Sequence, residues 1–435
     1  MRTAKGGEGY TPAMALTPEE RDILNGSQGE VMAKVLKTLA MYGDTFGADK
    51  FIPISGPGHL VTSFGISVMS ATFDLMDELI GAGVKAQQPF TVDPRPLDYE
   101  NVPCNLLQKI VFHVMYSKQA PYEEQLKKLG LKDSNAFTCT CYMDEVGNTP
   151  KKGDVLSWSE SSAVVYANSV LGARCNRNSA FMDIFGAILG KVPNFDLTTD
   201  EGRKAKWVVE VKTTRKPEAQ VLGSAIGLKV MEDVPYIRGL TAFIGAELNA
   251  EAKAYCKDMG AASASNGAVG LYHVEGLTPE AVEQGASLIR DDAQVYVVDD
   301  AELERVKKSY PVIWKNPEAR PKLCFIGCPH LSVGQLQEWT QRLENALKAA
   351  GASRLKIKTV LTAAPDVLEA FRKTPEYSRL LATGARLSYI CPLMYMNNPL
   401  CKGMPVVTNS NKLRTYTSAR YYTDDEIAAL AAGKE

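Results

Sequence analysis

The chain has 435 residues, of which 45% are hydrophobic and 23% charged, as in a globular protein with a large core. Its 49 Lys and Arg residues nearly balance 50 Asp and Glu residues, and this net charge of −1 excludes the basic footprint of a nucleic-acid-binding protein. No apolar run reaches the roughly 20 residues of a membrane span, and the polar first residues lack a signal peptide's apolar stretch, so we expect no membrane association. Nine cysteines, an odd number, predict reduced thiols and a cytoplasmic protein.

The first part of the chain is predicted to be mostly helical. A helix should begin at Pro18, because Thr17 can cap it and proline fits its first turn. Apolar residues at helical spacing predict a second helix over 31–42, and another is expected over 73–82. The apolar run 51–55 is typical of a strand that ends in a Gly-Pro-Gly turn.

The rest of the chain alternates strands with helices. In the middle, residues 207–212 and 294–298 are predicted strands, and a helix should open at Thr278-Pro279. Towards the end, predicted strands over 322–327, 355–361 and 387–390 are separated by predicted helices over 333–350 and 365–382. This alternation predicts βαβ units with a parallel sheet, so the fold class is α/β.

Three cysteines stand out by their context. Cys328 and Cys391 each follow a predicted strand and precede proline, and Cys139 lies in a Thr-Cys-Thr-Cys-Tyr segment. Ligands bind beyond the carboxyl ends of parallel strands, and proline follows cysteine ligands in some iron–sulfur proteins. Three thiolates could therefore hold an iron–sulfur cluster, whereas the alternative is that each cysteine is an ordinary buried thiol.

Polar residues are concentrated in residues 158–177 and again in 408–412. Ser and Asn are mediocre helix formers, and the two arginines of the first segment suit the binding of an anion. The alternatives are an amphipathic helix with a polar face and an ordinary loop. The chain has no Walker A loop, no HExxH motif and no GxSxG nucleophile elbow.

Seven segments occur together in this chain. They are PISGPGHL, PFTVDP, TCTCYMDEVGNTP, WSESSAVVYANSVLGARCNR, GCPHLS, ICP and TNSNK. Over roughly residues 17–412 they resemble the catalytic large component of aconitase X, a branch of the aconitase superfamily. The resemblance implies a multi-lobed aconitase-like core with parallel or mixed sheets flanked by helices. We expect lobes over about 17–135, 136–320 and 321–412, with tails at 1–16 and 413–435.

The resemblance implies a hydro-lyase that uses an iron centre as a Lewis acid. Known members dehydrate cis-3-hydroxy-L-proline, the leading candidate substrate here, or mevalonate 5-phosphate in archaea. The centre could be a [2Fe–2S] cluster, a [4Fe–4S] cluster or mononuclear iron, and its implied ligands are Cys139, Cys328 and Cys391. The expected catalytic residues are His59, Glu160, Ser161, His330 and Ser332. We expect Arg174, Arg177 and Lys412 to bind an anion. The full set of expected substrate-binding residues is Ser55, Thr91, Ser162, Asn168, Ser169, Arg174, Asn176, Arg177, Ser410 and Lys412.

This chain departs from the family pattern at three positions. Cys141 replaces a proline, which leaves open whether Cys139 or Cys141 is the ligand; Cys175 replaces a threonine and Asp93 an asparagine. One rival hypothesis is therefore a non-catalytic assembly protein that kept the fold. Another is an enzyme with a single iron or zinc ion on the thiolates.

The family resemblance also implies a partner. In the superfamily, the base that removes the C–H proton is a serine on a separate swivelling domain, and neither predicted tail is long enough to fold as one. We expect a heterodimer with a small subunit of roughly 130 residues, and an exposed apolar patch where that subunit docks.

Overall fold

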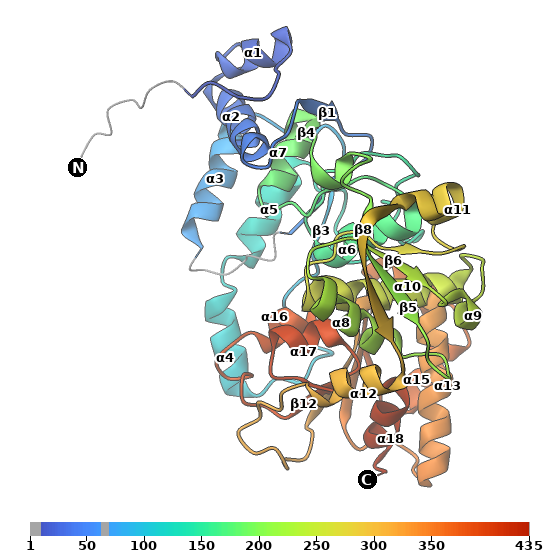
Figure 1. Ribbon diagram of the computed structural model, residues 1–435. Helices are drawn as coiled ribbons and strands as arrows, with labels where there is room; N and C mark the ends of the chain where they lie inside the picture. Colours follow the sequence, from blue (N-terminus) through green and yellow to red (C-terminus); the bar gives the residue numbers. More distant parts are fainter. Residues whose placement is uncertain (1–9, 62–68, 435) are drawn as a thin grey trace.

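The computed structural model describes residues 10–61 and 69–434 (Figure 1). They form two small two-stranded sheets and two larger parallel sheets of four and five strands. Helices flank these sheets, which confirms the predicted α/β class. No helix among the described residues is long and apolar enough to cross a membrane.

The N-terminal elements are mostly helices around two short strand pairs. Thr17 caps the first helix and shares a capping box with Glu20, as predicted. The helices are α1 (Pro18–Leu24), α2 (Glu30–Thr45), α3 (Ser70–Gly81), α4 (Leu106–Met115) and α5 (Gln119–Leu129). Helices α1 and α2 lie at the top of Figure 1, and α4 lies lower, beside α16 (Pro392–Met396). β1 (Phe51–Pro53) pairs antiparallel with β4 (Lys191–Pro193), and β2 (His59–Leu60) pairs parallel with β3 (Thr91–Val92).

The middle of the chain builds the four-stranded parallel sheet in the order β7-β6-β5-β8. Its strands are β5 (Ala205–Val211), β6 (Pro235–Arg238), β7 (His273–Val274) and β8 (Ile289–Val298). The helices are α6 (Ser161–Tyr166) with a π-turn over Ala167–Leu171, α7 (Met182–Leu189), α8 (Ala219–Val230), α9 (Thr241–Ile244), α10 (Ala250–Asn266), α11 (Pro279–Gln284) and α12 (Asp300–Lys308). Helices α8 and α10 approach so closely that a Cβ on Gly223 would lie 2.1 Å from the Met259 carbonyl oxygen.

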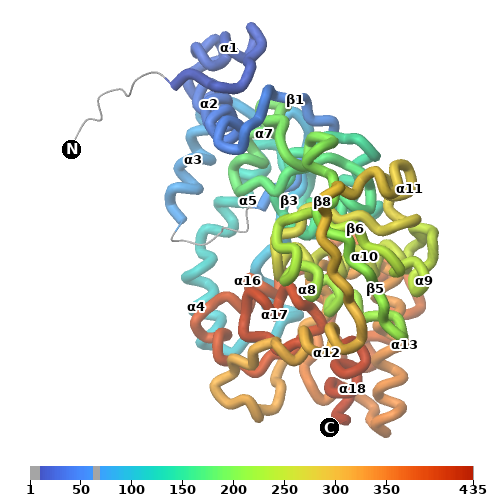
Figure 2. Tube along the Cα trace, viewed as in Figure 1, coloured from blue at the N-terminus to red at the C-terminus, as the bar shows by residue number. Residues whose placement is uncertain are grey.

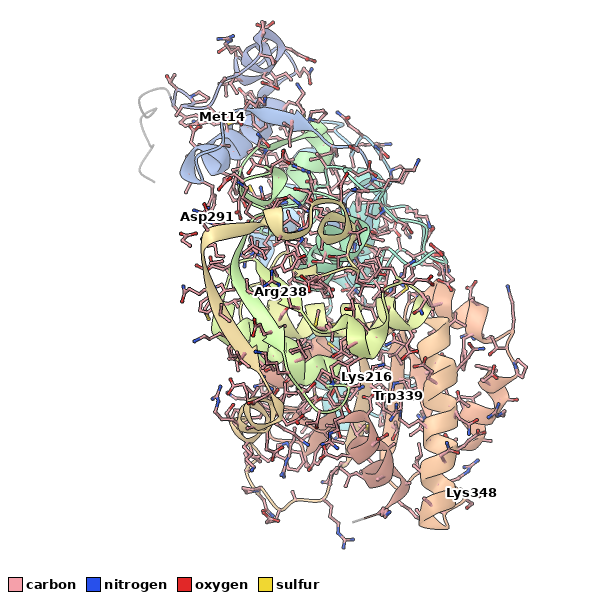
Figure 3. All side chains as sticks on the ribbon, turned by 45° about the vertical axis from the view of Figure 1, so that its right-hand side comes forward. Met14, Lys216, Arg238, Asp291, Trp339 and Lys348 are labelled. Atoms are coloured by element: carbon pink, nitrogen blue, oxygen red, sulfur yellow. The ribbon has the colours of Figure 1, made fainter. Side chains whose placement is uncertain are left out.

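The C-terminal part builds the five-stranded parallel sheet in the order β11-β10-β9-β12-β13. Its strands are β9 (Leu323–Leu331), β10 (Lys358–Ala363), β11 (Arg386–Ser388), β12 (Val406–Thr408) and β13 (Arg420–Tyr421). The helices are α13 (Val333–Ala350), α14 (Pro365–Phe371), α15 (Glu376–Ala382), α16 (Pro392–Met396), α17 (Asn411–Tyr416) and α18 (Asp424–Ala432). Trp339 and Lys348 mark α13 in Figure 3.

Three expectations for this part differ from the structure. The helix predicted over 365–382 is two helices, because Pro375 disfavours helical geometry in the residue before it. The strand predicted to end at Gly327 continues to Leu331 and is irregular there, with Gly327 at φ 100° and a register shift against β10. The segment 413–435, predicted as a tail, contributes β13 to the sheet and α18 to the core.

Segments far apart in the chain lie side by side. Helix α4 packs on α16, with Phe112 and Tyr395 ring centroids 5.3 Å apart and the Tyr116 hydroxyl donating to the Met394 carbonyl oxygen at 3.2 Å. Figure 2 shows the corresponding segments next to one another. The first hydrophobic core likewise joins residues from Met14 to Phe137 with residues from Ile184 to Phe195. The proposed lobe boundaries stay a prediction.

Candidate active site

Several candidate residues follow strands of the five-stranded sheet. Cys328 and His330 lie in the irregular end of β9, and Cys391 follows β11 as the N-cap of α16. Ser410 and Lys412 follow β12, which pairs with β9. Because all these strands are parallel, their carboxyl ends meet at one edge of the sheet, where such sheets bind ligands.

Backbone contacts hold the three cysteines of interest in place. The backbone N–H of His330 donates to Cys139 Sγ at 3.4 Å, which joins the Cys139 loop to β9. The backbone N–H of Cys391 donates to the Arg95 carbonyl oxygen at 2.9 Å. The hydroxyl of Ser410 donates to the Cys328 carbonyl oxygen. Each cysteine is thus tied to a different segment of the chain.

Cys328 affects the pKa of both other thiols. Burial raises the pKa of all three thiols, that of Cys391 to about 12, and Cys328 raises the pKa of Cys139 and Cys391 further. An isolated thiolate is therefore costly here, whereas a metal cation would favour it. Cys141 lies in the hydrophobic core of the middle lobe, while Cys139 is partly exposed, and this difference favours Cys139 as the ligand.

A buried ion pair lies beside the thiols. Lys412 Nζ contacts Glu160 Oε1, and the two side chains are 13% and 6% exposed. Glu160 is the N-cap of α6, and its Oε2 accepts hydrogen bonds of 2.6 Å from the Ala163 N–H and the Ser162 hydroxyl. Burial alone would lower the pKa of Lys412, but Glu160 and the thiols raise it above its ordinary value, so the ammonium stays charged.

His330 acts as a connection between segments. Its Nε2 lies 3.0 Å from the Ile390 carbonyl oxygen, which can only accept, so Nε2 carries the proton. Its Nδ1 then accepts from the Thr138 hydroxyl at 3.0 Å. Burial lowers the pKa of His330 to about 4. With both nitrogens engaged, the ring suits a positioning role.

His59 is arranged differently, because only one ring nitrogen has a partner. Its Nδ1 lies 2.9 Å from Thr91 Oγ1, which also accepts from Asn148 Nδ2 at 2.9 Å. Its Nε2 is buried without a hydrogen-bond partner among the described residues. Burial lowers the pKa of His59 to about 4, so the ring is neutral near pH 7.

Comparison with known proteins identifies the family. Residues 13–201 match the aconitase X first domain and residues 205–308 match the aconitase X second domain. The chain belongs to the aconitase X family. The prediction made from its motifs is confirmed.

Two kinds of dehydratase are similar to this aconitase X chain. It is 34% identical to the phosphomevalonate dehydratase large subunit of Thermococcus kodakarensis, over 81% of this chain and 82% of that protein. It is 31% identical to the phosphomevalonate dehydratase large subunit of Methanosarcina mazei, over 93% of this chain and 92% of that protein. The cis-3-hydroxy-L-proline dehydratase of Pseudomonas aeruginosa is 29% identical over 95% of this chain and 68% of that protein. The expected class, a dehydratase, is confirmed by these relatives.

A solved structure supports the fold. The crystal structure of Thermococcus kodakaraensis aconitase X in its holo-form has a TM-score of 0.79 and 31% identity, and the match covers 96% of this chain and all of that one. An aconitase-like family suggests an iron–sulfur cofactor. Within the described ranges, no three His, Cys, Asp or Glu side chains are grouped as ligands of one metal ion, and the metal ligands stay a prediction.

Most other predicted residues have partners inside the aconitase X fold. Arg174 pairs with Asp200 and donates to the Thr198 carbonyl oxygen at 3.0 Å, and Arg177 faces Asp196 and Tyr42. Ser332 caps α13, and Ser161 Oγ lies 3.5 Å from Lys412 Nζ. The rest bond to nearby backbone groups; they are Ser55, Asn168, Ser169 and Asn176.

Sequence reasoning missed two acids as site residues. Asp183 accepts from the Ser159 hydroxyl and from the Val61 N–H at 3.0 Å, and burial raises its pKa to about 6. Asp93 follows β3, and its Oδ1 is buried without a partner among the described residues. Burial, with Glu160 as a second cause, raises the pKa of Asp93 well above its ordinary value. Its departure from the family pattern was the available signal.

Proposed function

We propose that this chain is the large, catalytic subunit of an aconitase X dehydratase that removes water from a small hydroxy acid carrying an amino group. Cis-3-hydroxy-L-proline is the leading candidate. The observation that carries the proposal is the buried Lys412–Glu160 pair, which lies within electrostatic range of the Cys328 and Cys139 thiols. Thiolates suit an iron centre, and a buried ammonium suits a carboxylate.

The three cysteines fit an iron–sulfur centre by their chemistry, because cysteine thiolates are the usual ligands of such a centre. Whether it is [2Fe–2S], [4Fe–4S] or mononuclear iron is a matter for iron and sulfide analysis. When bound, the centre would supply a Lewis acid that polarises the C–O bond of the leaving hydroxyl. His330 would keep the Cys139 and Cys391 segments in register around it.

The chain's own residues would bind and orient the substrate. Lys412 stays charged because Glu160 pairs with it, so its ammonium can attract the substrate carboxylate. Ser161 and Ser162 lie 3.5 and 3.4 Å from the same ammonium and can share the substrate's polar groups. These groups are buried, so each contact to a substrate is stronger than it would be in water.

The charges around Lys412 support an amino acid rather than a phosphate. Glu160, Asp183 and the cation Lys412 all lie within electrostatic range of Asp93. Arg174 and Arg177, expected to grip an anion, face Asp200 and Asp196 instead. Mevalonate 5-phosphate is the second candidate, favoured by the higher identity to the archaeal large subunits.

A partner is the remaining part of the proposal. The archaeal relatives are named large subunits, which implies a small one. Helix α4 supports a small-subunit partner. One side of α4 packs on α16, the helix that Cys391 caps, and the other side is exposed to solvent. That exposed side consists of Leu106, Leu107, Ile110 and Val114, which are 76%, 58%, 54% and 62% exposed. We propose that the small subunit, of roughly 130 residues, docks on this α4 face and presents the base.

An anaerobic substrate screen tests the proposed function. The chain would be co-expressed with the small subunit encoded beside it, loaded with iron and sulfide, and offered hydroxyprolines, mevalonate 5-phosphate and small hydroxy acids. We expect dehydration of cis-3-hydroxy-L-proline. Dehydration of mevalonate 5-phosphate alone would select the second candidate. Absence of dehydration and of bound metal would favour the non-catalytic assembly protein.

A further inference from the structure

Asp93 is a partly buried acid with one buried carboxylate oxygen that has no hydrogen-bond partner among the described residues. Its backbone N–H donates to the Leu60 carbonyl oxygen at 3.1 Å, which fixes it at the end of the β2–β3 pair. Two residues later, the Arg95 carbonyl oxygen accepts the N–H of Cys391, so the Asp93 segment is tied to the Cys391 loop. Its Oδ1 has no hydrogen-bond partner within residues 10–61 and 69–434. Buried polar atoms are normally paired, so this one needs an explanation.

The neighbouring cations are already engaged. Lys412, within electrostatic range of Asp93, contacts Glu160. Arg95 binds both carboxylate oxygens of Glu123 at 2.9 Å and lies 3.8 Å from the Phe137 ring centroid. The other charged groups that face Asp93 are the carboxylates of Glu160 and Asp183. Burial and Glu160 raise the pKa of Asp93, and a cationic ligand group beside its carboxylate would favour the ionised form.

His59 offers a second unmatched atom next to the same ion pair. Thr91 Oγ1 accepts from Asn148, and its own hydroxyl hydrogen can reach His59 Nδ1 at 2.9 Å, whereas the Gly58 carbonyl oxygen is 3.5 Å away. When the Thr91 hydroxyl donates to His59 Nδ1, the ring proton lies on Nε2. That N–H is buried and unpartnered among the described residues. Glu160 and Lys412 both influence His59, as they do Asp93.

The geometry points to Asp93 as the residue that binds the ammonium of an amino acid substrate and rejects phosphorylated substrates. A zwitterion matches the unmatched groups, because its carboxylate can accept from His59 Nε2–H and Lys412 while its ammonium donates to Asp93 Oδ1. A phosphate at the same place would face Asp93 and Glu160. This inference rests on the proposed function and adds the residue that would decide between its two candidate substrates.

The test measures binding rather than turnover. The probes are L-proline and cyclopentanecarboxylate, which share a ring and a carboxylate and differ in the ring nitrogen. Their affinities would be measured by calorimetry on the complex of the full chain with its small subunit, for the wild type, Asp93→Asn and Asp93→Glu. Asp291→Asn, the same change at an exposed position of β8 (Figure 3), is the matched control.

We expect the wild type and Asp291→Asn to prefer L-proline by at least about tenfold, as for a charge-assisted hydrogen bond. Asp93→Asn should lose that preference, and Asp93→Glu should keep part of it. An unchanged preference in Asp93→Asn would overturn the inference. Dehydration of mevalonate 5-phosphate with no L-proline binding would also overturn it, while the dehydratase assignment would stand. Failure to bind either probe and to dehydrate any hydroxy acid would overturn both.

Discussion

At the residue scale, the site depends on a few buried side chains whose partners come from distant segments. Lys412 and Glu160 are 252 residues apart in the chain, and His330 connects Thr138 to Ile390. The Cys-Pro motifs and the TNSNK cluster identified Cys328, Cys391 and Lys412 as candidates. The roles of Arg174 and Asp93 could not be predicted, because a residue's type does not show which neighbour the fold brings to it.

The cysteines give the first prediction. Cys328→Ser and Cys391→Ser should each abolish iron binding and leave the chain folded, because a serine hydroxyl is a poor ligand for iron in such sites. Iron and acid-labile sulfide would be quantified after anaerobic purification, with circular dichroism to check folding. Cys141→Ser is the matched control and should keep its iron. Full iron occupancy in Cys328→Ser or Cys391→Ser would refute the ligand assignment.

The Lys412–Glu160 pair gives the second prediction. Lys412→Met leaves the buried Glu160 carboxylate unpaired, which should destabilise the chain by about 3–5 kcal/mol and abolish activity. The double variant Lys412→Met with Glu160→Gln should recover most of the stability but no activity, because the substrate carboxylate still lacks its ammonium. Denaturant unfolding and the dehydratase assay report the two effects. Activity restored in the double variant would return Lys412 to a purely structural role.

At the scale of elements, most boundaries followed from local signals and the exceptions had local causes. Helix α13 has its predicted bounds because Ser332 and Gln335 form a capping box and Gly351 ends the helix. Pro375 indicates the break between α14 and α15, but the apolar pattern over 365–382 led to the prediction of a single helix. The sequence does not predict that β9 continues through Cys328, because this part of the strand depends on pairing with β10.

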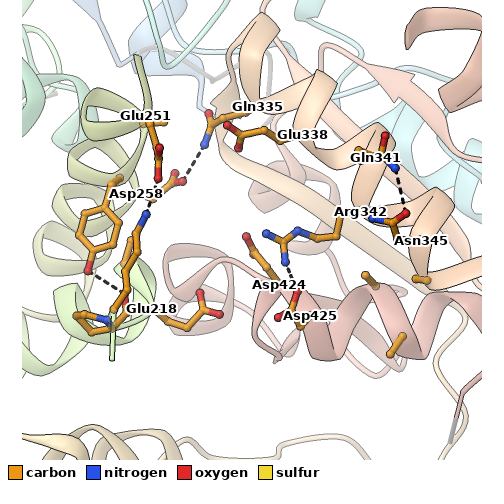
Figure 4. A pocket seen from close by; sticks show the side chains of 18 of the residues that line it. Glu218, Glu251, Asp258, Gln335, Glu338, Gln341, Arg342, Asn345, Asp424 and Asp425 are labelled. Atoms are coloured by element: carbon orange, nitrogen blue, oxygen red, sulfur yellow. Dashed lines mark hydrogen bonds and ion pairs between the residues drawn. The ribbon is translucent and has the colours of Figure 1, made fainter. Parts of the chain in front are cut away.

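Helices α8, α10, α13 and α18 also enclose a groove with many carboxylates. The groove has a volume of about 870 Å³, and Figure 4 shows Glu218, Asp424, Asp425 and Glu338 along it. Arg342 pairs with Asp425, and Gln335 donates to Asp258 Oδ2 at 2.9 Å. Burial, with Asp424 as a second cause, raises the pKa of Glu218 from 4.5 to about 7.

Glu218 gives the third prediction, a pH dependence. Between pH 4.5 and 7 the folded chain holds a proton on Glu218 that the unfolded chain has lost, so this residue makes stability fall as pH rises through that window. Glu218→Gln removes the effect and should gain about 1–3 kcal/mol relative to the wild type between pH 4.5 and pH 8. Unfolding at the two pH values measures it, with Glu304→Gln on the exposed side of α12 as control. A stability difference independent of pH would contradict the prediction.

At the scale of the whole molecule, the α4 face gives the fourth prediction. Ile110→Glu should weaken binding of the small subunit by at least about tenfold, because a carboxylate would be buried in an apolar interface. The chain itself should stay folded, since Ile110 is 54% exposed. Val282→Glu on α11, where the side chain is 63% exposed, is the matched control. Co-purification and calorimetry would measure binding, and equal affinity for both variants would place the interface elsewhere.

The central claim is that this aconitase X chain dehydrates a hydroxy acid together with a small partner. The most direct measurement follows cis-3-hydroxy-L-proline by nuclear magnetic resonance under anaerobic conditions, with the iron- and sulfide-loaded chain alone and then with its small subunit. We expect the substrate to be dehydrated only when both chains are present. Full turnover by the isolated chain would contradict the two-subunit account. If the iron- and sulfide-loaded chain with its small subunit left cis-3-hydroxy-L-proline unchanged, the proposed substrate would be contradicted.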